Sequence, residues 1–209
     1  MISTARRAVA RCALAVSLAG LLAACAGQEP PPDHFYRVDV PAATEPLAHP
    51  LFSGLVEVAP MIADGLVSDR AVVYLYADEP QEVRQYTYRF WNTPPAVLVQ
   101  EQLIRFLRGA HVADRVVSTD LRLPADVSVE GRVRRFEQVF SGKDVRLVID
   151  LELAVIRGKD QGLMLLKDYR AERLAQDDTL PAAATAAGEG LADIFARLLT
   201  DLRSPKVSS

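Results

Sequence analysis

Apolar and polar residues alternate along the second half of the chain, most regularly between Val145 and Ile156. Successive side chains of a strand point to opposite faces of a sheet, so this alternation predicts a strand with one buried face. Two similar stretches cover residues 127–140 and 163–174, and polar segments at 141–144 and 158–162 separate the three. We therefore predict three strands joined by turns into an antiparallel meander.

Two other stretches repeat their apolar residues at helical spacing. Pro94-Pro95 can begin a helix, because the first helical turn does not need the amide hydrogen that proline lacks, and Gly109 is a suitable end. A second helix begins near Asp178-Thr179, with Pro181 in its first turn. Each has a stripe that must pack on the sheet, formed by Val99, Leu103, Phe106 and Leu107 in the first and by Ala184, Ala187, Leu191, Ile194, Phe195, Leu198 and Leu202 in the second.

Shorter strand-like runs at 35–40, 55–58, 72–76 and 83–90 raise the count to at least five strands for two main helices. We expect an α/β fold: a three-layer α/β/α-like domain with a mixed, largely antiparallel sheet and a helix on each face. The single globular domain is expected over 51–202. Two flanking segments complete the predicted organisation, a proline-rich tether at 25–50 and a disordered polar tail at 203–209.

Aromatic residues gather in the predicted hairpin of the runs 72–76 and 83–90. Tyrosine and tryptophan combine an apolar body with a polar tip, which suits cross-strand packing and equally suits contact with a partner. Cross-strand or core packing is the favoured interpretation. The alternative is an interaction surface formed by Tyr74, Tyr76, Tyr86, Tyr88 and Trp91, next to Phe90.

Residues 1–24 have the parts of an export signal, with three arginines ahead of an apolar run of roughly 11 residues that is too short to span a bilayer. The run ends in Leu22-Ala23-Ala24-Cys25, which resembles the lipobox of bacterial lipoproteins. That resemblance implies cleavage between Ala24 and Cys25 and lipidation of Cys25, of the palmitate type. An ordinary secretory signal and a twin-arginine signal at Arg6-Arg7 are the alternatives.

Cleavage there would leave Cys25 as the one thiol of the mature chain, because Cys12 leaves with the signal. Loss of residues 1–24 would remove three basic residues and no acidic one, so the formal net charge would fall from −3 to −6. An acidic chain is a poor ligand for nucleic acid, and we expect none as a partner. Two or more acyl chains on Cys25 would give stable membrane anchoring where one would not.

Signatures of catalysis are missing from the sequence. It has no G-x-S-x-G, H-E-x-x-H, G-K-[ST] or G-x-G-x-x-G motif, and two of its three histidines, His34 and His49, lie in the expected tether. We therefore expect no enzyme, no metal site and no cofactor. Gly188 and Gly190 inside the second helix are unusual. They are interpreted as close packing on the sheet, with close approach of a partner helix or ligand as the alternative.

In order and spacing, these features resemble the ABC-type transport auxiliary lipoproteins, which include the PqiC-like component of paraquat-inducible and Mce-type transport systems. Outside the lipobox, the resemblance rests on Phe35-Tyr36-Arg37-Val38, Val56-Glu57-Val58-Ala59-Pro60, Val72-Val73-Tyr74, Tyr86-Thr87-Tyr88-Arg89-Phe90-Trp91 with Pro94-Pro95, the meander, and the alanine-rich helix after Pro181. It covers nearly the whole chain. The arginine before Phe90-Trp91 departs from the family pattern.

The resemblance implies a domain held on the periplasmic face of the outer membrane through acyl chains on Cys25, since Ala26 and Gly27 rather than aspartate follow the cysteine. It implies an accessory role beside an Mce-domain subunit and an inner-membrane ABC permease and ATPase, which move lipids or other hydrophobic molecules between membranes. A homo-oligomer is a further expectation. The main alternative is an outer-membrane assembly or pilotin-like lipoprotein that binds a β-barrel or secretin, and an anchored hydrolase is the third.

Overall fold

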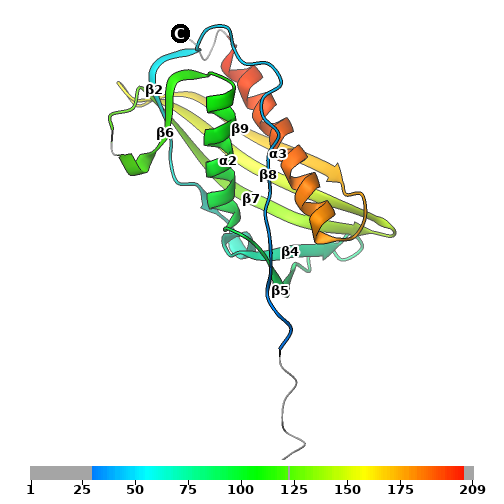
Figure 1. Cartoon of the computed structure of the whole chain (residues 1–209). Helices are drawn as coiled ribbons and strands as arrows, with labels where there is room; N and C mark the ends of the chain where they lie inside the picture. The colour runs from blue at the N-terminus through cyan, green and yellow to red at the C-terminus, as the bar shows by residue number, and fades with distance from the viewer. Residues whose placement is uncertain (1–29, 122, 205–209) are drawn as a thin grey trace, which may run out of the picture. The chain divides into compact units, whose positions relative to one another are not determined.

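The meander of three long strands is confirmed in the computed structural model, which describes residues 30–121 and 123–204. Strands β7 (Val127–Ser141), β8 (Asp144–Arg157) and β9 (Gly162–Leu174) pair antiparallel in sequence order (Figure 1). Every second residue of β8 is buried, as the alternation predicts: Val145, Leu147, Ile149, Leu151, Leu153 and Val155 all face the core.

Six shorter strands complete the sheet on the other edge of β7. Three of them lie parallel to successive parts of β7, namely β2 (Phe52–Val58), β3 (Ile62–Ala63) and β4 (Ala71–Tyr76). Strand β6 (Ala113–Ser118) pairs parallel with β2, β5 (Arg84–Trp91) antiparallel with β4, and β1 (His34–Tyr36) parallel with β5. The described residues thus form a nine-stranded mixed sheet, as predicted.

Helices α2 (Pro95–Gly109) and α3 (Leu180–Leu202) bury the two predicted apolar stripes. They lie on the same side of the sheet in Figure 1, and the rings of Phe106 and Phe195 meet with their centroids 5.5 Å apart. The 3-10 helix η1 (Gly65–Ser68) lies between β3 and β4 in the chain and buries Val67. A second short 3-10 helix, η2 (Thr119–Leu121), follows β6.

The expectation of one main helix on each face is therefore corrected, while the mixed sheet and the α/β class stand. The reason is visible in the charges of β7, β8 and β9. On the face turned away from the helices, Arg134 forms ion pairs with Glu152 and Asp168. Burying such charges under an apolar helix stripe would cost several kcal/mol per ion, so both helices cover the apolar face.

Residues 33–50 are packed on the domain, although the sequence assigned them to a tether. The compact unit begins at Asp33, and the side chain of Gln102 in α2 accepts from the Val40 amide and donates to the Val38 carbonyl at 3.4 and 3.2 Å. A Cβ on Gly188 would lie 2.2 Å from the carbonyl oxygen of Asp39. Gly188 is thus required by this segment, whereas Gly190 packs against Ile149 of the sheet as predicted.

Candidate functional site

A β-bulge in β7 shapes the face of the sheet opposite the helices, here called the outer face. The register between β7 and β8 shifts between Val133 and Arg135. A bulge inserts one extra residue, which interrupts the alternation of side chains between the two faces. Val133 and Phe136 are both buried in the core, so the two residues between them, Arg134 and Arg135, are both left to the outer face. Alternation alone would have assigned them to opposite faces.

The charges on this face are arranged in pairs. Arg135 donates from Nε to Glu137 at 2.6 Å, and Arg132 binds Asp64 at 2.6 Å. Arg134 bridges Glu152 and Asp168. Glu137 is only 5% exposed, and a buried carboxylate needs such a partner because desolvation penalises its charged form. These arginines therefore already have carboxylate partners and do not form a free anion site.

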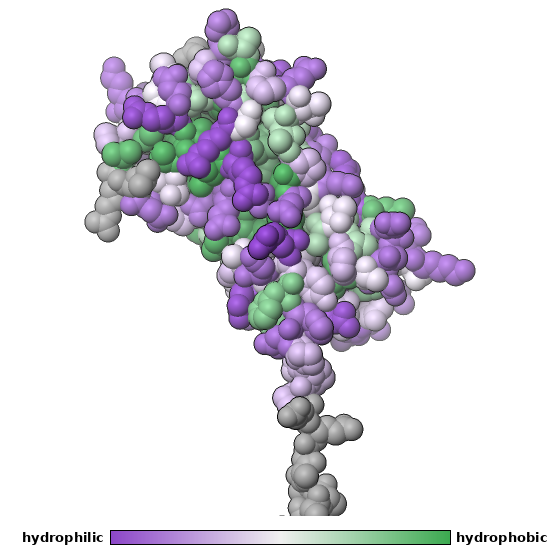
Figure 2. Space-filling model, viewed as in Figure 1, coloured by the Kyte–Doolittle hydropathy of each residue, from purple (hydrophilic) through white to green (hydrophobic). Residues whose placement is uncertain are grey.

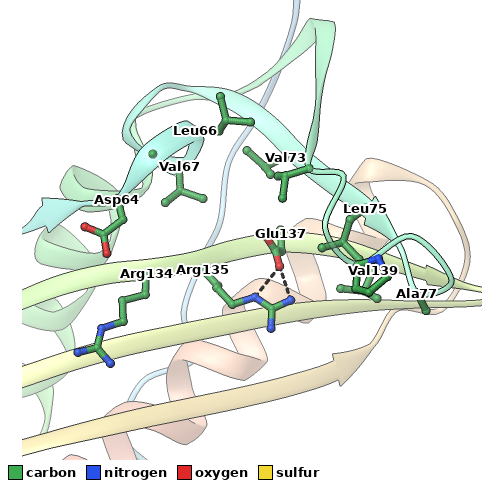
Figure 3. Close-up of a pocket in the computed structure, with 13 residues that line it drawn as sticks. Asp64, Leu66, Val67, Val73, Leu75, Ala77, Arg134, Arg135, Glu137 and Val139 are labelled. Carbon is green, nitrogen blue, oxygen red and sulfur yellow. Dashed lines mark hydrogen bonds and ion pairs between the residues drawn. The ribbon is translucent and has the colours of Figure 1, made fainter.

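An open cleft of about 630 Å³ lies beside these pairs (Figure 3). One wall is apolar and is formed by Leu66 and Val67 of η1, Val73 and Leu75 of β4, Val139 of β7 and Val83. The other wall carries Asp64, Arg134, Arg135 and Glu137. Apolar surface next to a few convergent polar groups is typical of a binding cleft for small or elongated apolar molecules. No serine, cysteine or histidine is among the described residues that line it.

The aromatic residues singled out in the sequence divide into two groups. Trp91 is 0% exposed and packs edge-on against Phe136 with centroids 5.3 Å apart, so it belongs to the core and not to a surface. Tyr74 lies 4.6 Å from Tyr86 and 6.1 Å from Tyr76, measured between ring centroids. Tyr88 is half-buried.

Tyr74, Tyr76 and Tyr86 form a partly exposed cluster with Phe140, a residue that the sequence analysis did not connect to them. The Phe140 ring lies 5.5 Å from that of Tyr76, which is 40% exposed. Burial, followed by the neighbouring Tyr74 phenol, raises the pKa of Tyr86. The phenol of Tyr86 thus stays neutral at physiological pH. The ring contacts are those of packing between neighbouring strands, and an interaction surface that includes Tyr76 stays a prediction.

A second aromatic group was missed. Phe35 of β1 stacks on Phe90 of β5 with centroids 5.6 Å apart, and the guanidinium of Arg70 lies 5.4 and 5.7 Å from the two ring centroids. Phe35 is nevertheless 52% exposed. The parallel pairing of β1 with β5 brings the two rings together. The local sequence pattern does not predict a pairing between strands that lie more than fifty residues apart in the chain.

The predicted lipidation and cleavage residues, Cys25 and Ala24, lie outside the described residues. Within 30–121 and 123–204, no group of three or more His, Cys, Asp or Glu residues is arranged to hold a metal ion. No helix in the same part of the chain has the length and apolar character needed to cross a membrane. His111 adopts a left-handed backbone conformation, and its Nδ1 lies 3.2 Å from the Leu47 carbonyl oxygen, so its role is to hold the segment before β2.

Comparison with solved structures supports the fold. Protein XCC0632 from Xanthomonas campestris aligns with a TM-score of 0.68 at 20% identity, over 79% of this chain and 92% of that one. An uncharacterized protein aligns with a TM-score of 0.64 at 17% identity, over 82% of this chain and 99% of that one. At these identities the likeness concerns the fold alone.

Comparison of sequences adds the family. No curated protein matches the chain. Residues 36–198, from the end of β1 to the last turns of α3, match the family described as the ABC-type transport auxiliary lipoprotein component. The resemblance inferred from the order of motifs is thereby confirmed. The chain belongs to the family of ABC-type transport auxiliary lipoproteins.

Proposed function

We propose that this protein is a non-enzymatic lipoprotein of the outer membrane, an accessory component of an ABC/Mce-type transporter that moves lipids or other hydrophobic molecules between the inner and outer membranes. The observation that carries the proposal is the family match over residues 36–198, in a chain whose upstream segment ends in Leu22-Ala23-Ala24-Cys25. Acyl chains on Cys25 hold the domain at the periplasmic face of the membrane.

The geometry of the domain fits a binding role. The described part of the chain combines a rigid sheet with an open cleft whose one wall is apolar. Its charged side chains on the outer face stabilise one another, and the cleft lacks a nucleophile beside a general base, which acyl-transfer chemistry would need. The domain therefore contributes surfaces that contact a transporter subunit or its cargo, while the ATPase supplies the energy.

Copurification tests this proposal. The full-length protein, tagged after Ser209, is crosslinked in cells and recovered from detergent-solubilised membranes, with an unrelated outer-membrane lipoprotein of similar size as the control. The expected result is recovery of an Mce-domain protein together with an ABC permease or ATPase, and increased envelope permeability on deletion. Recovery of an outer-membrane β-barrel or a secretin in place of these subunits would contradict the proposal and favour the pilotin-like alternative.

A further inference from the structure

Three apolar side chains that belong to β1, to η1 and to the residues just before β5 are exposed. Phe35 is 52% exposed, and Leu66 in η1 and Val83 before β5 are each 42% exposed. The Gln85 side chain donates to the Leu66 carbonyl at 3.3 Å, which joins η1 to β5. Arg70 follows η1 directly and reaches the rings of Phe35 and Phe90. We call Phe35, Leu66 and Val83 the apolar rim.

The length of the chain before the domain limits how far this rim can lie from Cys25. Seven residues, 26–32, separate Cys25 from Asp33, where the compact unit begins, so the chain takes eight Cα-to-Cα steps between them. At 3.3–3.6 Å per residue, the fully extended chain covers about 26–29 Å. A domain of this size has a radius of gyration of about 16 Å and a diameter of about 40 Å. The tether is shorter than the domain is wide, so an acylated Cys25 keeps β1 close to the lipid.

The composition of the rim suits a lipid surface. The helix side seen in Figure 2 is mostly hydrophilic, with apolar residues in small scattered patches. The aromatic ring of Phe35 in the rim lies beside the guanidinium of Arg70. The aliphatic stem of an arginine can cover apolar surface while its charge remains in water. Aromatic and arginine side chains of this kind favour the boundary between headgroups and acyl chains.

We infer that the apolar rim rests on the lipid surface to which Cys25 is attached, with Phe35 at the boundary of headgroups and acyl chains and Arg70 at the level of the phosphates. The inference rests on the proposed acylation of Cys25. The acyl chains supply the affinity for the membrane, and the rim fixes the orientation of the domain. Electrostatic attraction to anionic lipid adds little near the rim, because Arg84 is paired with the acidic Glu79 and Glu82. Leu66 and Val83 also line the cleft, so this orientation turns the cleft mouth toward the lipid.

Fluorescence quenching by lipid tests the orientation. The acylated full-length protein is reconstituted into phosphatidylethanolamine and phosphatidylglycerol vesicles that contain phosphatidylcholine brominated on its acyl chains. The Phe35→Trp variant is compared with Leu163→Trp. Leu163 is 61% exposed at the start of β9, and the strand register places it about 30 Å along the sheet from the level of β5. Trp91 is buried in both variants and gives the same background.

The expected result is strong quenching of the tryptophan at position 35 and no more than background quenching at position 163. Equal quenching at both positions, or none at position 35, would overturn the inference, since a domain that is only tethered has no fixed contact with acyl chains. Flotation of each variant with the vesicles reports anchoring separately, so a failure of acylation is distinguished from a wrong orientation. Circular dichroism confirms that both variants are folded.

In the non-acylated mature chain carrying Cys25→Ser, the rim is the remaining lipid contact. Partition of this chain to the same vesicles is expected to fall about fivefold to tenfold on Phe35→Ser, because half of a phenylalanine side chain is withdrawn from the lipid, and to stay unchanged on Leu163→Ser. Equal effects of the two substitutions would count against the rim.

Discussion

Asp201 is the side chain that ties the end of α3 to strand β9. Its carboxylate accepts hydrogen bonds from the Lys167 ammonium at 2.8 and 3.0 Å and from the Tyr169 hydroxyl at 2.6 Å. Burial opposes ionisation of Asp201, but the hydrogen bonds from Lys167 and Tyr169 outweigh it and lower its pKa below 3.8. Burial, followed by the hydrogen bond to Asp201 and the negative charge of its carboxylate, raises the pKa of Tyr169 far above its ordinary value. Asp201 and Tyr169 therefore stabilise the native state most when Asp201 is an ionised carboxylate and Tyr169 is a neutral phenol.

This arrangement predicts an acid-dependent loss of stability. A carboxyl group whose pKa is lower in the folded state stabilises the protein above its unfolded pKa, and the contribution is lost as the pH falls through the folded value. We expect Asp201→Asn to lower the free energy of unfolding by about 1 kcal/mol at pH 7, since the group is partly exposed and screened. The difference from the unmodified protein should shrink below pH 3.8. Urea unfolding between pH 7 and pH 2.5 measures it.

Asp193 on the same helix provides the control, because it pairs with Arg173 and Arg197 at 3.3 Å on the surface. Asp193→Asn is expected to change stability by less than about 0.5 kcal/mol. A loss for Asp201→Asn that persists undiminished at pH 2.5 would show that the side chain acts through packing and not through its charge.

At the residue scale, sequence patterns predict burial better than they predict contacts. The alternation in β8 identified six buried residues of one face, because a single strand has only two faces, but it did not identify Val148, which is buried as well. The placement of both Arg134 and Arg135 on the outer face could not be predicted, since a bulge depends on the register in which two strands pair and not on the sequence of one strand alone. For Trp91 the favoured prediction of core packing is confirmed, because it is fully buried, and the alternative of an interaction surface is excluded at this position.

At the element scale, α3 and the backbone of the segment 37–40 approach each other closely at Gly188. A methyl group at position 188 would lie 2.2 Å from the Asp39 carbonyl oxygen, which is backbone and cannot move alone. Glycine costs a helix about 1 kcal/mol relative to alanine, so its presence here indicates that the close approach contributes more than this cost.

Two glycine-to-alanine substitutions are expected to have opposite signs. Gly188→Ala should destabilise the protein by about 1–3 kcal/mol through overpacking and should expose residues 37–50 to proteolysis. Gly109→Ala at the end of α2 should be neutral or stabilising by up to about 1 kcal/mol, because nothing lies within 4 Å of the added methyl group. Urea unfolding and limited trypsin digestion measure both. Equal stabilisation by the two substitutions would contradict the close packing of the segment.

The long elements were predictable because each carries its own period over many residues. The helices α2 and α3 and the strands β7, β8 and β9 all appear where apolar spacing placed them. The strand-like run at 35–40 appears as β1, which is shorter than predicted. Strand β3 and the successive parallel pairings along β7 were not predictable in the same way. Local pattern identifies the face that is buried but not the partner that buries it, and for the same reason the two helices were expected on different faces.

At the scale of the whole molecule, the domain begins at Asp33, well before the position that the proline content suggested. Six prolines between residues 30 and 50 exclude helix, yet extended chain can still pack on helices when side chains such as Gln102 satisfy its backbone. The connection to Cys25 is accordingly short. With Cys25 acylated, as proposed, a domain on such a connection stays close to the membrane.

Cell fractionation of Cys25→Ser tests the central claim most directly. The unmodified full-length protein and the variant are expressed at equal levels, and membranes are separated on a density gradient. The account predicts that the unmodified protein is found with the outer membrane, while the variant is folded, soluble in the periplasm and unable to restore the barrier function of a deletion strain. Retention of the variant in the outer-membrane fraction would contradict the account, because attachment would then not depend on the cysteine.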